Sequence, residues 1–411
     1  MVTVSLERLQ LEARRVAGWT TTALGFTIPI WVVADSILLT LLVVCWLASG
    51  EWKERARRIT TNPVAVSVLL LFGWLLLGTL WGEGSLQERA LAIKKYADLL
   101  LVPVLISIAV TVQERHRAIL TLAVSLLATL LLSFGLGMGF LPLTSETLGC
   151  NPSDSCVFKK HTTHNVLMAF GALLFVVLAW KASRRWVRWG WSIAAVLAAS
   201  NVLFLVQGRT GYLVLAGLAM LVFHVVFGWR GVLSAIVVVC GVFWGAYQIS
   251  SSFHQRVDLV TSGMTQWDPH VAVVGDSIGW RLEYVYHTVE IIQDHPLVGV
   301  GTGGFVQAYR ARTAQAGLDV PPHPHNQYLF IMAQVGIGGL GLLLWLFAQQ
   351  WRVTTLASDV TAGLLAKGLI VTIAITCLFQ PALNDHTEKL FYCLFSGLMC
   401  AGNHPQSEAK T

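Results

Sequence analysis

The chain has 411 residues, of which 55% are hydrophobic and only 12% are charged, and its formal net charge at pH 7 is +6. In a soluble protein roughly a quarter of the residues are charged, so this composition excludes an ordinary soluble domain. It predicts an all-α, polytopic membrane protein, because apolar runs of roughly 17–25 residues cross a bilayer as helices.

Twelve apolar segments follow one another along the chain and are the predicted membrane spans. To within a few residues at each end they cover 16–33, 36–49, 63–81, 99–112, 118–140, 166–180, 191–206, 212–227, 232–249, 326–347, 362–378 and 390–401. The first two segments have a second interpretation, as one long segment broken near Asp35. No repeat or low-complexity linker divides the chain, so residues 1–411 are predicted to form a single membrane domain.

The lysine and arginine residues favour one orientation of these spans. If the N-terminus is inside, basic clusters such as 53–58 and 181–188 fall in short cytoplasmic segments, and the short outside loops are less basic. Basic residues are retained on the cytoplasmic side, so both termini are predicted to be cytoplasmic. The net positive charge therefore reflects topology. No RNA or DNA module interrupts the helices, so nucleic acid is not an expected partner.

The outside loop between the fifth and sixth spans contains "GCNPSDSC", with Cys150 and Cys156. On an oxidising face these two cysteines are candidates for a local disulfide, and free thiols are the alternative. A metal site on this pair would lack two further ligands.

The same loop ends in "VFKKHTTHN", at the mouth of the sixth span. Lys159 and Lys160 either contribute to a basic pocket there or are surface charges. His161 and His164 have the spacing to share one helix face, but acidic or cysteine partners are not evident beside them, so no metal site is predicted.

Arg209 lies in "QGRTGY", the short outside turn between the seventh and eighth spans. Positive charge there opposes the positive-inside tendency, which favours a functional role. The alternative is an anchor whose side chain reaches lipid headgroups. Guanidinium groups bind phosphate oxygens in bidentate fashion, so a basic pocket at the membrane surface suits a lipid-linked phosphate or pyrophosphate.

Residues 250–325 form a large outside loop between the ninth and tenth spans. In "RLEYVYHTVEIIQDHP" the apolar residues recur at helical spacing, which predicts an amphipathic helix that begins near Arg281. "LVGVGTGGF" follows. It lacks the strand context and the Gly-Lys-Ser/Thr of a phosphate-binding loop, so it is interpreted as a tight turn.

The sequence "HPHNQYL" opens the tenth span, with His325 expected in the first turn of its helix. A helix N-terminus and nearby arginines disfavour a protonated imidazole, so a neutral histidine is predicted, as a general base requires. The alternative is a histidine that caps the helix or binds headgroups. His323 lies further from the helix and is the weaker candidate.

The stretch "RLEYVYHTVEIIQDHPLVGVGTGGF", followed by "HNQYLFIMAQVGIGG", resembles the bacterial O-antigen ligase family and its wider ligase and polymerase superfamily. The resemblance implies transfer of a glycan from undecaprenyl pyrophosphate to the lipid A-core oligosaccharide, with inversion and without metal or other cofactor. It implies that His325 is the family's periplasmic histidine and that Arg209 and Arg281 are its two periplasmic arginines. An acidic residue of the family corresponds to Asp385 in "NDHTEK".

Together these features predict a glycosyltransferase of the bacterial inner membrane with a periplasmic active site. His325 is expected to act as the base, and Arg209 and Arg281 to hold the pyrophosphate. The predicted supporting residues are Asp385, Lys159, Lys160, His323 and Asn326. The expected partners are the lipid-linked donor, the lipid A-core acceptor and membrane lipids. Two alternatives stay open: an O-antigen polymerase or protein O-oligosaccharyltransferase of the same superfamily, and a transporter or flippase for a lipid-linked anion.

Overall fold

The computed structural model describes residues 2–108, 111–141, 150, 154–206, 208–267, 277–314, 319–356 and 359–401. Within these ranges every regular element is a helix, which confirms the predicted all-α class. The first helices are α1 (Val2–Thr27), α2 (Val32–Ala48), α3 (Trp52–Thr61), α4 (Pro63–Gly78), α5 (Leu86–Ala97), η1 (Asp98–Leu100), α6 (Leu101–Ile108), α7 (Val112–Gly137), α8 (His161–Lys181) and α9 (Arg185–Ser200). The chain continues with η2 (Asn201–Leu205), α10 (Arg209–Phe227), α11 (Trp229–Ile249), α12 (Ser251–Gln266), α13 (Ser277–Asp294), α14 (Phe305–Thr313), α15 (Gln327–Thr355), α16 (Val360–Thr376) and α17 (His386–Cys400).

Six helices of the described ranges are long and apolar enough to cross a membrane, and counting the bent pair α2 and α3 as one span gives seven. The six are α7, α8, α9 with η2, α10, α11 and α15, and α4 and α16 are shorter apolar helices. The protein is therefore a polytopic membrane protein. Each of the twelve predicted segments overlaps a helix, but their number as membrane spans stays a prediction.

Several helices begin at residues whose side chains cap the backbone. Ser85 and Thr111 start α5 and α7 with capping boxes that close on Glu88 and Glu114. Asn62 accepts from two backbone N–H groups at the start of α4. Each such cap is worth about 1 kcal/mol, so local sequence fixes where these helices start.

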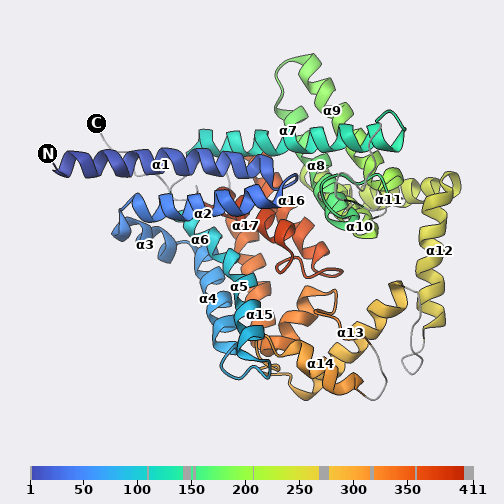
Figure 1. Cartoon of the computed structure of the whole chain (residues 1–411). Helices are drawn as coiled ribbons and strands as arrows, with labels where there is room; N and C mark the ends of the chain where they lie inside the picture. Colours follow the sequence, from blue (N-terminus) through green and yellow to red (C-terminus); the bar gives the residue numbers. More distant parts are fainter. Residues whose placement is uncertain are drawn as a thin grey trace.

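The most buried helices are α8 and α17, which lie near the middle of the upper part of the structure in Figure 1, whereas α12, α13 and α14 lie apart from them. Phe170 of α8 meets Phe391 of α17 edge to face, with ring centroids 4.9 Å apart. Between apolar helices in a membrane the hydrophobic driving force is small, so close packing of this kind supplies much of the association.

The first two segments are separate helices, α1 and α2, which lie side by side in Figure 1. The chain turns between them at residues 28–31, before Asp35 rather than at it. Asp35 lies in the first turn of α2, where its Oδ1 accepts a hydrogen bond of 2.6 Å from the Thr27 hydroxyl. The alternative of a single broken segment is therefore wrong.

The described part of the 250–325 loop contains three helices, α12, α13 and α14. The sequence predicts only the second of them. Phe305 and Tyr309 of α14 join Ile291 and Ile292 of α13 in a small apolar cluster that includes Phe330 of α15. The loop is thereby fixed to the first half of α15 and is part of the folded structure.

The glycine-rich turn packs against a break in α15. Val335 and Gly336 leave the helical conformation, with φ of +67° at Gly336. The turn donates backbone hydrogen bonds to this break, from Val300 N to Ala333 O (2.9 Å) and from Gly301 N to Gln334 O (2.8 Å). A Cβ at Gly336 would lie 2.0 Å from Leu297 O. The predicted tight turn is confirmed, and its glycines permit this close backbone contact.

Candidate active site

The predicted site residues come from five separate parts of the chain. They are the residues before α8 (Lys160), the start of α10 (Arg209), the first turns of α13 (Arg281), the segment before α15 (His323, His325) and the turn before α17 (Asp385). The charges of Arg281 and Lys160 lower the pKa of His325. The charge of Arg209 lowers the pKa of Arg281, and the charge of Asp385 opposes the lowering of the pKa of His323. The fold therefore brings these residues into one site.

His325 lies just outside the helix, and the prediction that it occupies the first turn is wrong. Asn326 is the N-cap of α15, and its Oδ1 accepts from Leu329 N at 3.0 Å. Because the cap falls on Asn326, His325 is one residue before it, with φ of +54°. This left-handed conformation is uncommon outside glycine, and Asn, Asp and His adopt it more often than other residues. Asn326 also donates to Leu378 O at 3.1 Å, which ties the segment to the end of α16.

The imidazole of His325 has an aromatic neighbour on one side and a histidine on the other. The Tyr284 ring stacks on it with centroids 6.0 Å apart and an interplanar angle of 15°. The His323 ring is 4.5 Å away and nearly perpendicular. His325 N donates to His323 Nδ1 at 3.4 Å, so His323 accepts through an unprotonated nitrogen. His323 therefore contacts His325 both through its ring and through a hydrogen bond to the His325 backbone.

Burial is the main cause that lowers the pKa of His325 to about 4, and the charges of His323, Arg281 and Lys160 add to it. The shift is in the direction expected from the sequence, although the leading cause is burial rather than the helix terminus. At neutral pH the imidazole is neutral. An imidazole in this form can accept a proton, which is the requirement for a general base.

Arg281 and Arg209 are both half-buried, and their positive charges repel each other. Burial lowers the pKa of Arg281, and the charge of Arg209 lowers it further. Two half-buried guanidinium groups that repel each other favour the binding of an anion between them, because each can donate paired hydrogen bonds to phosphate oxygens.

The two adjacent lysines face different surroundings. Lys160 Nζ is 3.5 Å from Asp385 Oδ2, and its charge acts on His325. Lys159 is only 6% exposed, and the carboxylates that act on it are Asp35 and Glu388. The structure therefore brings Lys160 and Asp385 to the site, whereas Lys159 belongs to a separate buried charge cluster.

Tyr284 is a site residue that the sequence interpretation missed. It is three residues after Arg281 on α13, so the two lie on the same face of that helix. The i, i+3 spacing was the signal available. Nothing in the sequence showed that this face meets the segment before α15.

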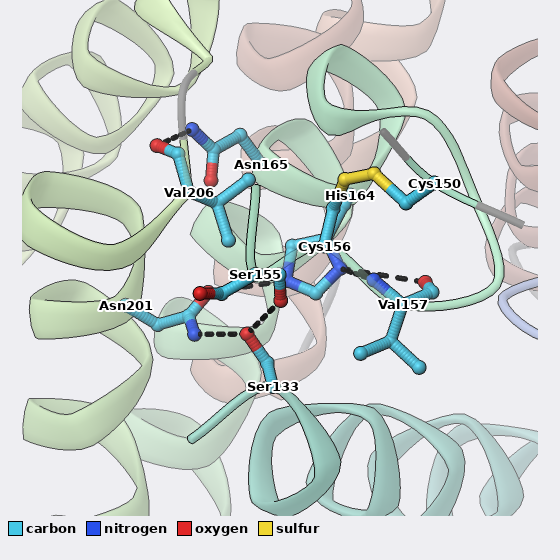
Figure 2. Close-up of a disulfide and its surroundings, with 9 residues drawn as sticks. All are labelled: Ser133, Cys150, Ser155, Cys156, Val157, His164, Asn165, Asn201 and Val206. Carbon is cyan, nitrogen blue, oxygen red and sulfur yellow. Dashed lines mark hydrogen bonds between the residues drawn. A yellow bond between two sulfur atoms is a disulfide. The ribbon is translucent and has the colours of Figure 1, made fainter. Parts of the chain in front are cut away.

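The charges of Arg281, Lys160 and Arg209 act on His161 of "HTTHN", so His161 lies at the site, whereas the cysteine pair and His164 lie beside it. Cys150 and Cys156 are joined by a disulfide, with Cα atoms 5.8 Å apart (Figure 2). His164 is buried, its Nε2 lies 3.1 Å from Asn201 Oδ1, and its Nδ1 accepts from Val157 N at 3.3 Å. Both ring nitrogens are thus used in structural hydrogen bonds.

The model of a protein family described as O-Antigen ligase matches residues 194–346. The matched segment includes Arg209, Arg281, His323 and His325, and it leaves out Lys160 and Asp385. No curated protein is detectably similar to the chain.

Proposed function

We propose that the protein is a glycosyltransferase that moves a glycan from undecaprenyl pyrophosphate to the lipid A-core oligosaccharide, and the match of residues 194–346 to the O-antigen ligase family model supports this proposal. In this proposal the reaction takes place at the periplasmic face of the bacterial inner membrane and needs no metal. The proteins of this family are glycosyltransferase-like enzymes of glycan processing.

The observation that carries the proposal is the position of His325, whose ring stacks on Tyr284, three residues after Arg281 on α13, so that the charge of Arg281 acts on it. The hydroxyl of an acceptor sugar transfers its proton to His325 as its oxygen bonds to the anomeric carbon of the donor glycan. The bond between that carbon and the pyrophosphate oxygen breaks, and undecaprenyl pyrophosphate leaves with the bonding electrons. Arg209 and Arg281 stabilise the negative charge on this leaving group. Attack from the face opposite the leaving group inverts the configuration.

The supporting residues bind the acceptor or hold the backbone of His325 in this proposal. Asp385 and Lys160 lie close to each other and act electrostatically on His323, so we assign them to the acceptor side of the site. His323 holds the backbone of His325, and Asn326 fixes the start of α15 beside it.

A product assay with three acceptors tests the proposal against its relatives. Purified protein is given a lipid-linked glycan and, in separate reactions, lipid A-core, a second lipid-linked repeat or a pilin, and the products are resolved on a gel. We expect the glycan to appear on lipid A-core. Product only on the second lipid-linked repeat would make the protein a polymerase, and product only on pilin a protein glycosyltransferase. Movement of intact donor across vesicles without new product would support a transporter.

The periplasmic position of the site predicts which residues an impermeant thiol reagent reaches. Ala311 of α14 is exposed in the loop, and Lys53 of α3 is exposed in the segment predicted to be cytoplasmic. In a background that lacks the exposed Cys240, Ala311→Cys is expected to react in intact spheroplasts and Lys53→Cys only after permeabilisation. The reverse pattern would place the site in the cytoplasm and contradict the proposal.

A further inference from the structure

The turn that carries Arg209 is not held by its own side chains. The chain leaves the π-helix η2 at Val206 in an extended conformation, and α10 begins at Arg209 after Gly208. Gly208 is the N-cap of α10 and offers no side chain to cap it. Within the turn, Val206 O accepts from Gly208 N at 3.0 Å and Gly208 O accepts from Gly211 N at 3.1 Å, so each carbonyl keeps one lone pair for a hydrogen bond from another part of the chain.

Asn165 of α8 supplies those hydrogen bonds. Its Nδ2 donates to Val206 O at 3.1 Å, as Figure 2 shows, and to Gly208 O at 2.9 Å, so one carboxamide binds both sides of the turn. Asn165 is fully buried. Arg256 Nη1 also donates to Val206 O, at the longer distance of 3.4 Å.

The glycines of "QGRTGY" make room for Asn165. A Cβ at Gly208 would lie 2.4 Å from Asn165 Nδ2, and one at Gly211 would lie 2.8 Å from Asn165 Cβ. The carboxamide thus sits directly against the backbone on both sides of Arg209. A side chain longer by one methylene, such as Gln, would not fit in this contact without moving the turn.

A second set of hydrogen bonds, made by the side chain of Asn201, holds the start of the π-helix η2, as Figure 2 shows. Asn201 Nδ2 donates to Ser133 Oγ at 2.7 Å, and Ser133 Oγ donates to Ser155 O at 2.7 Å. His164 Nε2 is 3.1 Å from Asn201 Oδ1. Because Val157 N donates to His164 Nδ1, the proton lies on Nε2 and is donated to Asn201. Both ends of the turn are therefore held, and π-helical turns of this kind often occur at functional sites.

We propose that Asn165 is a positioning residue that sets the place of the Arg209 guanidinium relative to Arg281, and so the geometry of the pyrophosphate site. The inference rests on the proposed function of Arg209. It assigns a role to the "HTTHN" segment that lies outside the matched domain. Loss of the carboxamide removes two of the hydrogen bonds that hold the turn, and Arg209 then spends less time where both guanidinium groups reach one pyrophosphate.

The test combines binding and transfer in the variants Asn165→Ala and Asn165→Ser, alone and with Arg209→Lys. Binding is measured with undecaprenyl pyrophosphate itself, and undecaprenyl phosphate serves as the comparison lipid. A misplacement of about 1 Å at a reacting group can cost about 100-fold, so we expect Asn165→Ala to lower kcat/KM for the donor by about that factor. Binding of the pyrophosphate should weaken in the same variant, and binding of the monophosphate should change less.

The double variant separates positioning from a merely structural role. When Arg209 is already Lys, we expect Asn165→Ala to cost no more than about threefold further, because coupled residues are not additive. Asn165→Ser keeps one donor and covers the case in which the alanine variant does not fold. Asn62→Ala is the matched control, since Asn62 is also buried and donates to Cys400 O at 3.0 Å, but at the start of α4. It is expected to lower stability without changing the ratio of pyrophosphate to monophosphate binding.

Three results would overturn the inference: wild-type kcat/KM in both Asn165 variants, effects of Asn165→Ala and Arg209→Lys that multiply fully, or equal loss of binding for both lipids. Failure of the wild-type protein to transfer glycan to any acceptor would instead count against the proposed function. In that case the coupling of Asn165 to Arg209 is still decided by the pyrophosphate binding measurements.

Discussion

Replacing Arg281 with lysine is expected to lower glycan transfer by at least about tenfold, although the positive charge is kept, because leaving-group stabilisation of a few kcal/mol is at stake. Lysine cannot donate the paired hydrogen bonds that a guanidinium gives to phosphate oxygens. The charge of Arg209 disfavours the charged form of Arg281, and a bound anion between them would relieve this repulsion. Arg209→Lys should have a similar effect. Both are measured as initial rates of transfer with donor at saturation and at limiting concentration.

The matched control is Arg312→Lys in α14 of the same loop. Arg312 makes ion pairs with Glu290 and Asp294 away from the site, so its replacement should leave the rate within about twofold, as is usual for a surface pair. Wild-type activity in both Arg281→Lys and Arg209→Lys would reduce the two arginines to surface anchors.

Replacing His325 with alanine is expected to lower transfer by roughly 10²–10⁴-fold, the usual contribution of a general base. The protein should still fold and still bind undecaprenyl pyrophosphate, because the arginines remain in place. His323→Ala should cost less, since His323 contacts His325 through its backbone and takes no proton in the proposed step.

His254→Ala provides the control for loss of a histidine in the large loop. His254 lies on α12, 47% exposed, and pairs with Asp258. Its replacement should leave transfer unchanged. Near-wild-type turnover in His325→Ala at saturating donor and acceptor would make His325 a structural residue and remove the mechanism proposed here.

Composition and hydropathy predicted the helical class, because burial in lipid leaves the chain few other choices. The break in α15 was not predicted, since the apolar run continues through Val335 and Gly336 without a signal. The break depends on contact with the glycine-rich turn, which lies in a different part of the sequence. The helices α12 and α14 were missed for a related reason: they are short or weakly apolar, and tertiary packing decides them.

Parts of the proposed site were predicted on different grounds. A positive charge in a tight turn indicated Arg209, the start of an apolar helix indicated His325, and the family resemblance indicated Arg281. None of these grounds distinguished Lys159 from Lys160, since the direction of each side chain is set by contacts with α2 and α17. Asn165 was missed because its partners are backbone carbonyl groups, which leave no pattern in the sequence.

The central claim is that a neutral His325 is the base, and the pH dependence of kcat/KM for the donor tests it most directly. This quantity reports the pKa of an essential group in the free enzyme. The neutral imidazole is the active form, and its pKa is lowered from 6.5 to about 4, so activity is lost only as the pH falls through the lowered value. We predict a constant kcat/KM from about pH 8 to about pH 5 and a fall at lower pH, with donor hydrolysis corrected by an enzyme-free reaction. An acid limb centred at 6.5 or above, or the same limb in His325→Ala, would contradict the account.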